Sequence, residues 1–212
     1  MQESDGERLN RGLETVRQYV ADLSLSPETS EVAELIYQQA LTSPDVSLVG
    51  RGVAVIAASA VHIACRQTGD VRTANEIAAT TESPSVDDKR VHRTTKYLSS
   101  QLGIGLVVAD PKDFVDRIGE KLNAPDEDIA LAKHLVDILK EDGIAVNQAA
   151  NTIAATAFYY VGAYDRSHGR YTQKEVSEAG DLSALTIRNN YRDYCEVLSE
   201  DDVQSFYDNK LD

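Results

Sequence analysis

Residues 53–64 read VAVIAASAVHIA, and residues 150–161 read ANTIAATAFYYV. The pattern I-A-A-[ST]-A therefore occurs twice, with Ile56 and Ile153 in equivalent places 97 residues apart. Each copy lacks a polar face, and a helix that is apolar nearly all round is a buried one. The sequence thus predicts one central helix in each half of the chain. A cofactor-binding helix is the alternative, but no polar constellation accompanies either copy.

The segments before the two copies also match, which makes the likeness an internal repeat. Apolar residues three and four apart predict a first helix, namely Leu9, Leu13, Val16, Val20 and Leu23. Ser26 can cap the next helix, and Pro27 suits its first position. In the second half, Phe114, Ile118 and Leu122 form the corresponding first helix, and Pro125 opens the second helix as Pro27 does.

The segments after the two copies match as well. Thr73 with Glu76, and Thr172 with Glu175, each form a capping box at the start of a short helix. A turn and a last helix follow, spanning roughly residues 85–98 and 183–198. We therefore expect an all-α fold of two five-helix repeats, residues 1–104 and 105–212, each ending in a helix-turn-helix-like pair. The segment GIGLVVADP, residues 103–111, is expected to link them, because its GxG lacks the rest of a nucleotide-binding pattern.

The composition argues against a membrane protein. No window of the 212 residues approaches 18 uninterrupted apolar residues, so no membrane partner is expected. The first ten residues, MQESDGERLN, lack the apolar core of a signal peptide, and we expect a cytoplasmic protein. The two cysteines, Cys65 and Cys195, are then expected to be reduced and buried.

Metal sites and catalytic sites find no support in the sequence. No CxxC exists, which excludes a zinc ribbon or finger within this chain. The four histidines form no HxxxH or HxxE pair, and they are His62, His92, His134 and His168. His62 lies inside the first alanine-rich helix and is expected in the core or at its rim. We predict no metal, no cofactor and no enzyme, because no nucleophile stands with a base and no phosphate loop occurs.

The net charge of −14 allows two explanations. Such a charge repels nucleic acid phosphates, so the protein could bind something other than DNA. Alternatively, it comes from a salt-loving organism, where the Debye length in molar salt falls to about 3 Å and global charge stops mattering beyond contact range. Acidic residues spread along the whole chain favour the second explanation.

Two long stretches carry a resemblance to a known family. They are GRGVAVIAASAVHIACRQTGDVRTANEIA, residues 50–78, and YTQKEVSEAGDLSALTIRNNYRDY, residues 171–194. The chain, from about residue 9 to residue 198, resembles the two-repeat, cyclin-like core of archaeal transcription factor B and of general transcription factor IIB. The resemblance implies a cyclin-like fold in both repeats. It also implies an archaeal, nucleoid-associated initiation factor core that binds promoter DNA and the TATA-binding protein.

The resemblance further implies that the last helix of the second repeat reads an element upstream of TATA. Leu185 and Arg188 match the family's base-reading positions, and they suit a thymine methyl group and a guanine edge. Contacts to phosphate or flanking bases are expected from Ser183, Thr186, Asn189 and Arg192. A merely solvated helix face is the alternative.

The first repeat carries the densest basic cluster, which consists of Lys89, Arg90, His92, Arg93 and Lys96. Arg93 and Lys96 are expected to bind DNA. Contacts to phosphate or to a protein partner are expected from Arg51, Arg72, Lys89 and Arg90.

Three departures from the family pattern matter. The family's N-terminal zinc ribbon is not in this chain, which suggests an excised core or a shortened paralogue, with RNA polymerase a partner only if a ribbon exists outside it. The second repeat opens with AVNQAAN, residues 145–151, instead of a G-K-S-P-like turn and so loses a cation. The segment ATTESPSVDDKR, residues 79–90, is longer and more acidic than usual. The alternative function is therefore a diverged adapter or paralogue that binds the TATA-binding protein or another protein without reading DNA sequence.

Overall fold

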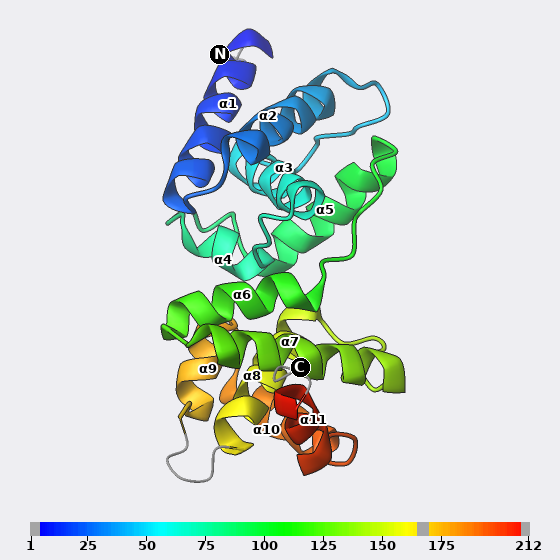
Figure 1. The fold of residues 1–212 in the computed structure, drawn as a ribbon. Helices are drawn as coiled ribbons and strands as arrows, with labels where there is room; N and C mark the ends of the chain where they lie inside the picture. Colours follow the sequence, from blue (N-terminus) through cyan, green and yellow to red (C-terminus); the bar gives the residue numbers. More distant parts are fainter. Residues whose placement is uncertain (1–4, 165–169, 209–212) are drawn as a thin grey trace. The chain divides into compact units, whose positions relative to one another are not determined.

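The computed structural model describes residues 5–164 and 170–208, and every regular element in those ranges is an α-helix (Figure 1). The predicted all-α class is confirmed. The chain divides into two compact units, Met1–Ala109 and Asp110–Asp212. They separate five residues after the boundary at residue 104 that the sequence suggested.

The first unit is built around a central helix. Its helices are α1 (Asp5–Asp22), α2 (Pro27–Thr42), α3 (Val53–Thr68), α4 (Ala74–Ala79) and α5 (Asp88–Gln101). Helix α3, cyan in Figure 1, contacts each of the other four. Eleven consecutive residues of α3, from Val55 to Cys65, are buried. The prediction of a helix that is buried all round is therefore confirmed, and its alanines are what allow four neighbours to approach.

The second unit repeats this plan and adds a helix. Its helices are α6 (Pro111–Leu122), α7 (Asp126–Asp142), α8 (Ala150–Tyr164), α9 (Gln173–Ala179), α10 (Ala184–Tyr194) and α11 (Glu200–Asp208). Helix α8 contacts α6, α7, α9 and α10, and all its residues from Thr152 to Phe158 are buried.

Helix α11 was not predicted from the sequence and packs on α7. The expected single helix over residues 183–198 ends at Tyr194, and a new helix begins at Glu200. A local signal for this start exists: the Ser199 N–H donates to Asp202 at 2.7 Å, and the Asp202 N–H donates to Ser199 Oγ at 3.3 Å. This S-x-x-D arrangement is a variant of the capping box.

The predicted caps are present with one exception. Both capping boxes form, at Thr73 with Glu76 and at Thr172 with Glu175. Ser26 caps α2, which begins at Pro27. Pro125, however, does not open α7 but precedes it as the N-cap, because its ψ of 148° is extended. Three acidic residues fill the first turn of α7 instead, where the positive end of the helix dipole favours them.

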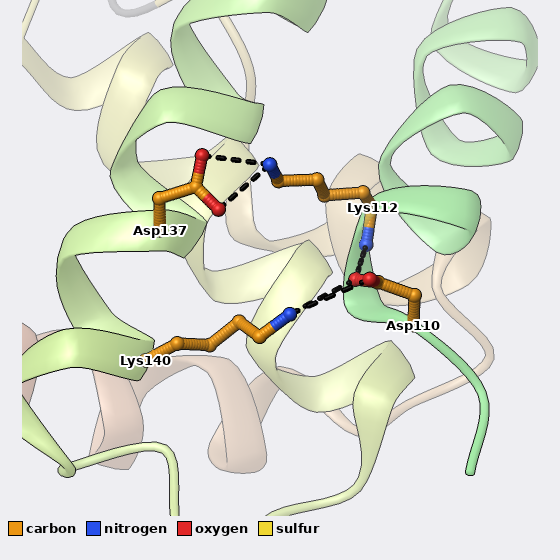
Figure 2. A network of polar contacts seen from close by, with 4 residues as sticks. All are labelled: Asp110, Lys112, Asp137 and Lys140. Carbon is orange, nitrogen blue, oxygen red and sulfur yellow. Dashed lines mark hydrogen bonds and ion pairs between the residues drawn. The ribbon is translucent and has the colours of Figure 1, made fainter.

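Two lysines tie α6 to α7 at the start of the second unit (Figure 2). Lys112 Nζ lies 2.7 Å from Asp137 Oδ2, and Lys140 Nζ lies 3.4 Å from Asp110 Oδ2. Asp110 is also the N-cap of α6, and its Oδ1 accepts the Lys112 N–H at 3.0 Å. Burial by itself would raise the pKa of Asp110, but the Lys112 N–H and the Lys140 ammonium outweigh burial and lower it.

The cysteines and histidines are placed partly as expected. Cys65 is buried, but Cys195 is exposed, which corrects the expectation of two buried thiols. Cys195 is the C-cap of α10 and directly follows the buried Tyr194, so its side chain lies outside the buried face of that helix. His62 is a core residue as predicted, and its Nδ1 lies 3.1 Å from Thr95 Oγ1. His168 lies outside the described residues.

Among residues 5–164 and 170–208, no cluster of three or more His, Cys, Asp or Glu side chains could hold a metal ion. No helix in the same ranges is long and apolar enough to cross a membrane.

Candidate nucleic-acid interface

Helices α9 and α10 form the predicted helix-turn-helix-like pair of the second unit. Gly180 is the C-cap of α9, Asp181 turns the chain with a φ of 57°, and Ser183 is the N-cap of α10. A Cβ added at Gly180 would lie 2.8 Å from the Cβ of Ala155 in α8. Glycine at this position therefore lets the turn of the pair sit directly against the central helix.

Helix α10 presents one face to solvent and one to the core. Ile187 and Tyr194 are fully buried. The residues expected to read or flank bases point outward, and they are Leu185, Arg188, Asn189 and Arg192. Leu185 is 64% exposed, which is unusual for a large apolar side chain and suits a contact that is absent in the free protein.

Two of the predicted contact residues are engaged in the cap of α10. Ser183 Oγ accepts the Thr186 N–H at 3.1 Å and lies 2.8 Å from Thr186 Oγ1. Their hydroxyl groups therefore fix the start of the helix. Arg192 Nε lies 3.7 Å from Asp193 Oδ1, an exposed pair that holds the guanidinium only weakly.

Helix α10 is anchored to the turn that opens the second repeat. The Tyr194 hydroxyl donates to Gln148 Oε1 at 2.7 Å, and Gln148 Nε2 donates to the Ile144 carbonyl at 3.1 Å. The pKa of Tyr194 is raised, by burial first and by Asp193 second, so its hydroxyl stays a donor. Tyr191 stacks edge-on against Tyr159 of α8, with ring centroids 5.0 Å apart. The uncharged Gln148, where the family pattern has a cation, is thus a structural residue that positions α10.

The basic cluster of the first unit occupies the matching face of α5. With the N-caps Asp87 and Ser183 aligned, the exposed α10 residues correspond to Lys89, His92, Arg93 and Lys96, all of which are exposed. The buried residues correspond too, because Val91 pairs with Ile187 and Leu98 with Tyr194. The repeat therefore presents the same face in both units, basic on α5 and mixed on α10.

His92 lies within this basic face and next to the buried His62, with ring centroids 6.5 Å apart. Its pKa is lowered by partial burial, then by Lys96 and Arg66, and Asp88 opposes them. Burial, with smaller contributions from Arg66 and His92, lowers the pKa of His62 to about 3. His62 is therefore neutral near pH 7.

The remaining predicted residues separate into two groups. Arg51, Arg90 and Arg93 line one pocket next to the start of α3. Arg72 does not line it: its Nη2 donates to the Leu23 carbonyl at 3.0 Å and its Nη1 to the Val71 carbonyl at 2.9 Å. These bonds give Arg72 a structural role at the turn between α1 and α2, which its sequence motif did not reveal.

Comparison with known proteins identifies the repeat. The Transcription factor TFIIB repeat matches residues 6–101. Transcription initiation factor IIB 3 of Halobacterium salinarum is 30% identical over 194 residues, which cover 91% of this chain and 59% of that protein. The chain belongs to the TFIIB family.

Further members of the TFIIB family agree with this assignment. Transcription initiation factor IIB 2 of Haloferax volcanii is 31% identical over 92% of this chain and 57% of its own length. Transcription initiation factor IIB of Methanopyrus kandleri is 32% identical over 83% of this chain and 55% of its own length. The chain thus spans less than two thirds of the relatives it matches. Salt-loving archaea are among the sources, in line with the salt-adapted explanation of the −14 charge.

The TFIIB family consists of transcription factors and not of enzymes, as the sequence predicted for this chain. Among solved structures, a viral cyclin from herpesvirus saimiri aligns with a TM-score of 0.40 and 12% identity, over 94% of this chain and 87% of the cyclin. That likeness is too remote to add to the assignment.

Proposed function

We propose that the chain is the promoter-recognition core of an archaeal general transcription initiation factor. In this proposal it binds promoter DNA together with the TATA-binding protein, and α10 reads the element upstream of TATA. The observation that carries the proposal is the outward face of α10, where Leu185 and Arg188 are exposed on a capped, anchored helix. Membership of the TFIIB family supports the role in initiation.

Each exposed side chain of α10 has a distinct part in this proposal. The Arg188 guanidinium can donate two parallel hydrogen bonds to the N7 and O6 acceptors of a guanine in the major groove. Leu185, one turn earlier, can contact a thymine methyl group. Asn189 and Arg192 reach flanking bases or phosphates. Ser183 and Thr186 cap α10 and place the start of this helix at the DNA backbone.

The first unit supplies contacts that do not depend on base sequence. Arg93 and Lys96 are exposed cations on α5 and would meet phosphates, with Lys89 beside them. Arg51 and Arg90 would contact a phosphate or the partner protein in the same region. The net charge of −14 opposes all of these contacts at long range, and molar salt removes that opposition.

A pair of single substitutions tests the proposal. Arg188→Ala should remove the preference for an intact upstream element, because losing a bidentate contact costs about 1–3 kcal/mol of discrimination. Arg93→Ala should weaken binding alike on all sequences, since phosphates carry no direct sequence information.

The assay is ternary binding with the TATA-binding protein at fixed salt, on promoters with intact and scrambled upstream elements. An equal loss on both promoters for Arg188→Ala would remove the base-reading role of α10.

One observation favours the second candidate, an adapter that binds protein without reading DNA. The turn at Gln148 carries no cation. The side-chain amide of Gln148 is engaged inside the protein, where it accepts from the Tyr194 hydroxyl and donates to the Ile144 carbonyl. An adapter would bind the TATA-binding protein equally with and without DNA, even near molar salt, and that result would replace the promoter-core proposal. RNA polymerase enters either proposal only through a zinc ribbon outside this chain, and the cytoplasmic, nucleoid-associated location stays a prediction.

A further inference from the structure

One segment of the second unit carries two side-chain amides that reach the helix-turn-helix-like pair. The segment is residues 147–151, NQAAN, which leads into α8. Gln148 Oε1 accepts the Tyr194 hydroxyl at 2.7 Å, and Asn151 Nδ2 donates to the Gly180 carbonyl at 3.0 Å. Gly180 lies in the turn before α10, and Tyr194 is the last residue of α10. The two amides, which we call the amide bracket, therefore hold α10 at both ends.

The groups that the amide bracket holds are buried. Tyr194 is fully buried, and Gly180 lies so close to α8 that a Cβ on it would be 2.8 Å from that of Ala155. Gln148 and Asn151 themselves are half-buried. Away from water a hydrogen bond is electrostatically stronger, and a buried group that loses its partner is costly. The amide bracket therefore constrains α10 more than a pair of exposed bonds would.

Packing by itself would leave α10 some freedom to slide and to rotate. Ile187 and Tyr194 bury the inner face of α10, but the attraction between apolar surfaces is non-directional. A hydrogen bond, in contrast, holds its donor and acceptor about 2.7–3.2 Å apart and within a limited range of angles. One such bond near each end fixes both the rotation of α10 and its position along its own axis.

The first unit lacks the amide bracket, which makes it an internal comparison. The positions of Gln148, Asn151 and Tyr194 are taken there by Arg51, Ala54 and Leu98. Ala54 has no amide in its side chain, and Leu98 has no hydroxyl group. Helix α5 is joined to α3 near its middle instead, where His62 Nδ1 lies 3.1 Å from Thr95 Oγ1. The amide bracket is therefore a feature of the second unit and not a by-product of the repeat.

The amide bracket leaves the outward face of α10 free. Leu185 and Arg188 are exposed, whereas Tyr194 turns its hydroxyl inward to Gln148. In the function proposed above, Leu185 and Arg188 meet base edges and the two amides touch no base. A group that recognises a ligand by geometry has to be held within about 0.5 Å of its productive position, and residues behind it supply that precision.

We propose that Gln148 and Asn151 are positioning residues for base reading, so that the amide bracket sets how strongly α10 prefers an intact upstream element. This inference rests on the proposed function of α10. Without the amide bracket, α10 still folds and still meets DNA, but Leu185 and Arg188 approach the base edges with poorer alignment. The preference for the intact element then falls more than the affinity for DNA in general.

Two substitutions that add the same charge to the same segment test the proposal. Gln148→Glu keeps an acceptor for the Tyr194 hydroxyl, whereas Asn151→Asp cannot donate to the Gly180 carbonyl. Both should weaken binding to a scrambled element alike, because each adds one negative charge. Only Asn151→Asp should lower the ratio of affinities for intact and scrambled elements, by about 2- to 10-fold, as expected for one lost hydrogen bond. Equal ratios in the two variants would overturn the amide bracket.

A double-variant cycle separates positioning from fold stability. Gln148→Met leaves the buried Tyr194 hydroxyl without its acceptor, and Tyr194→Phe then removes that hydroxyl. Replacing both partners by apolar groups of similar shape is less costly than removing one, so the double variant should regain stability relative to Gln148→Met in urea unfolding. The regained stability should not restore the preference for the intact element. A double variant with the ratio of the parent would contradict the positioning role.

Hydrogen exchange of the free protein distinguishes this inference from the function on which it rests. Asn151→Asp should speed the exchange of backbone amides in α10 but not in α5, which mass spectrometry of the two peptides would show. If the parent has no preference for the intact element, base reading by α10 fails. In that case faster exchange confined to α10 supports the amide bracket, and unchanged exchange overturns it too. If the parent has the preference and Asn151→Asp alters neither the ratio nor the exchange, the amide bracket fails and the proposed function stands.

Discussion

The buried imidazole of His62 should make folding sensitive to acid. His62 is 2% exposed, and burial lowers its pKa from 6.5 to about 3, with Arg66 and His92 adding to the effect. In the unfolded chain the pKa returns to its ordinary value. Between pH 6.5 and pH 3 the unfolded state therefore binds a proton that the folded state does not, and stability falls as pH falls through this window.

The size of the effect follows from the two pKa values. At pH 5, linkage between 6.5 and about 3 gives a loss of about 2 kcal/mol relative to pH 8. This is a large part of the roughly 5–15 kcal/mol by which a domain is stable. Carboxylates titrate as well, so the contribution of His62 must be isolated by a variant.

The variant is His62→Gln, which keeps an amide near Thr95 Oγ1 but cannot titrate. Urea unfolding followed by circular dichroism, at pH 8, 7, 6 and 5 in constant molar salt, gives the free energy of unfolding for each protein. The parent should lose about 2 kcal/mol more than His62→Gln between pH 8 and pH 5. Thr95→Val is the control, since it removes the partner, leaves the imidazole buried, and should keep the slope of the parent. Identical pH profiles for the parent and His62→Gln would refute the reasoning.

Three further predictions concern packing and charge. Ala58→Leu and Ala155→Leu should each overpack a fully buried position of a central helix and cost about 1–3 kcal/mol in urea unfolding; unchanged unfolding would remove the central-helix assignment. Gly180→Ala should cost a similar 1–3 kcal/mol or so, because its Cβ would lie 2.8 Å from that of Ala155, whereas Gly105→Ala, with nothing within 4 Å, should be close to neutral. Thermal unfolding should show stability rising toward molar salt, because salt screens the repulsion behind the −14 charge; full stability in dilute buffer would contradict salt adaptation.

The helical plan of this protein could be predicted from sequence because its signals are local. The buried faces of α3 and α8 appear as alanine-rich runs, and the capping boxes at Thr73 and Thr172 join residues three apart. Such signals act between residues within about one helical turn, so they do not depend on how the helices pack against one another. Even α11 had a local signal in Ser199 and Asp202, although the uninterrupted apolar spacing before it suggested one longer helix.

The outward residues of α10 and the basic face of α5 were also predictable, because both follow from helical periodicity. Ile187 of α10 and Val91 of α5 face the core. On each helix, the polar residues that follow the buried residue point to the opposite side and must face solvent. Sequence could name these side chains as candidates. It could not say which of their donors would remain free.

That selection came only from tertiary structure. Arg72 and Arg51 look alike in their motifs. Arg72, however, donates to the Leu23 carbonyl 49 residues away, while Arg51 lines a pocket together with Arg90 and Arg93. Gln148 looks like a lost cation and is in fact the acceptor for Tyr194, 46 residues on. A hydrogen bond needs two groups within about 3 Å, and packing alone decides which distant groups come that close. The sequence therefore determined the helices and their faces, and the packing of one helix on another decided which charged side chains hold the fold and which are left for a partner.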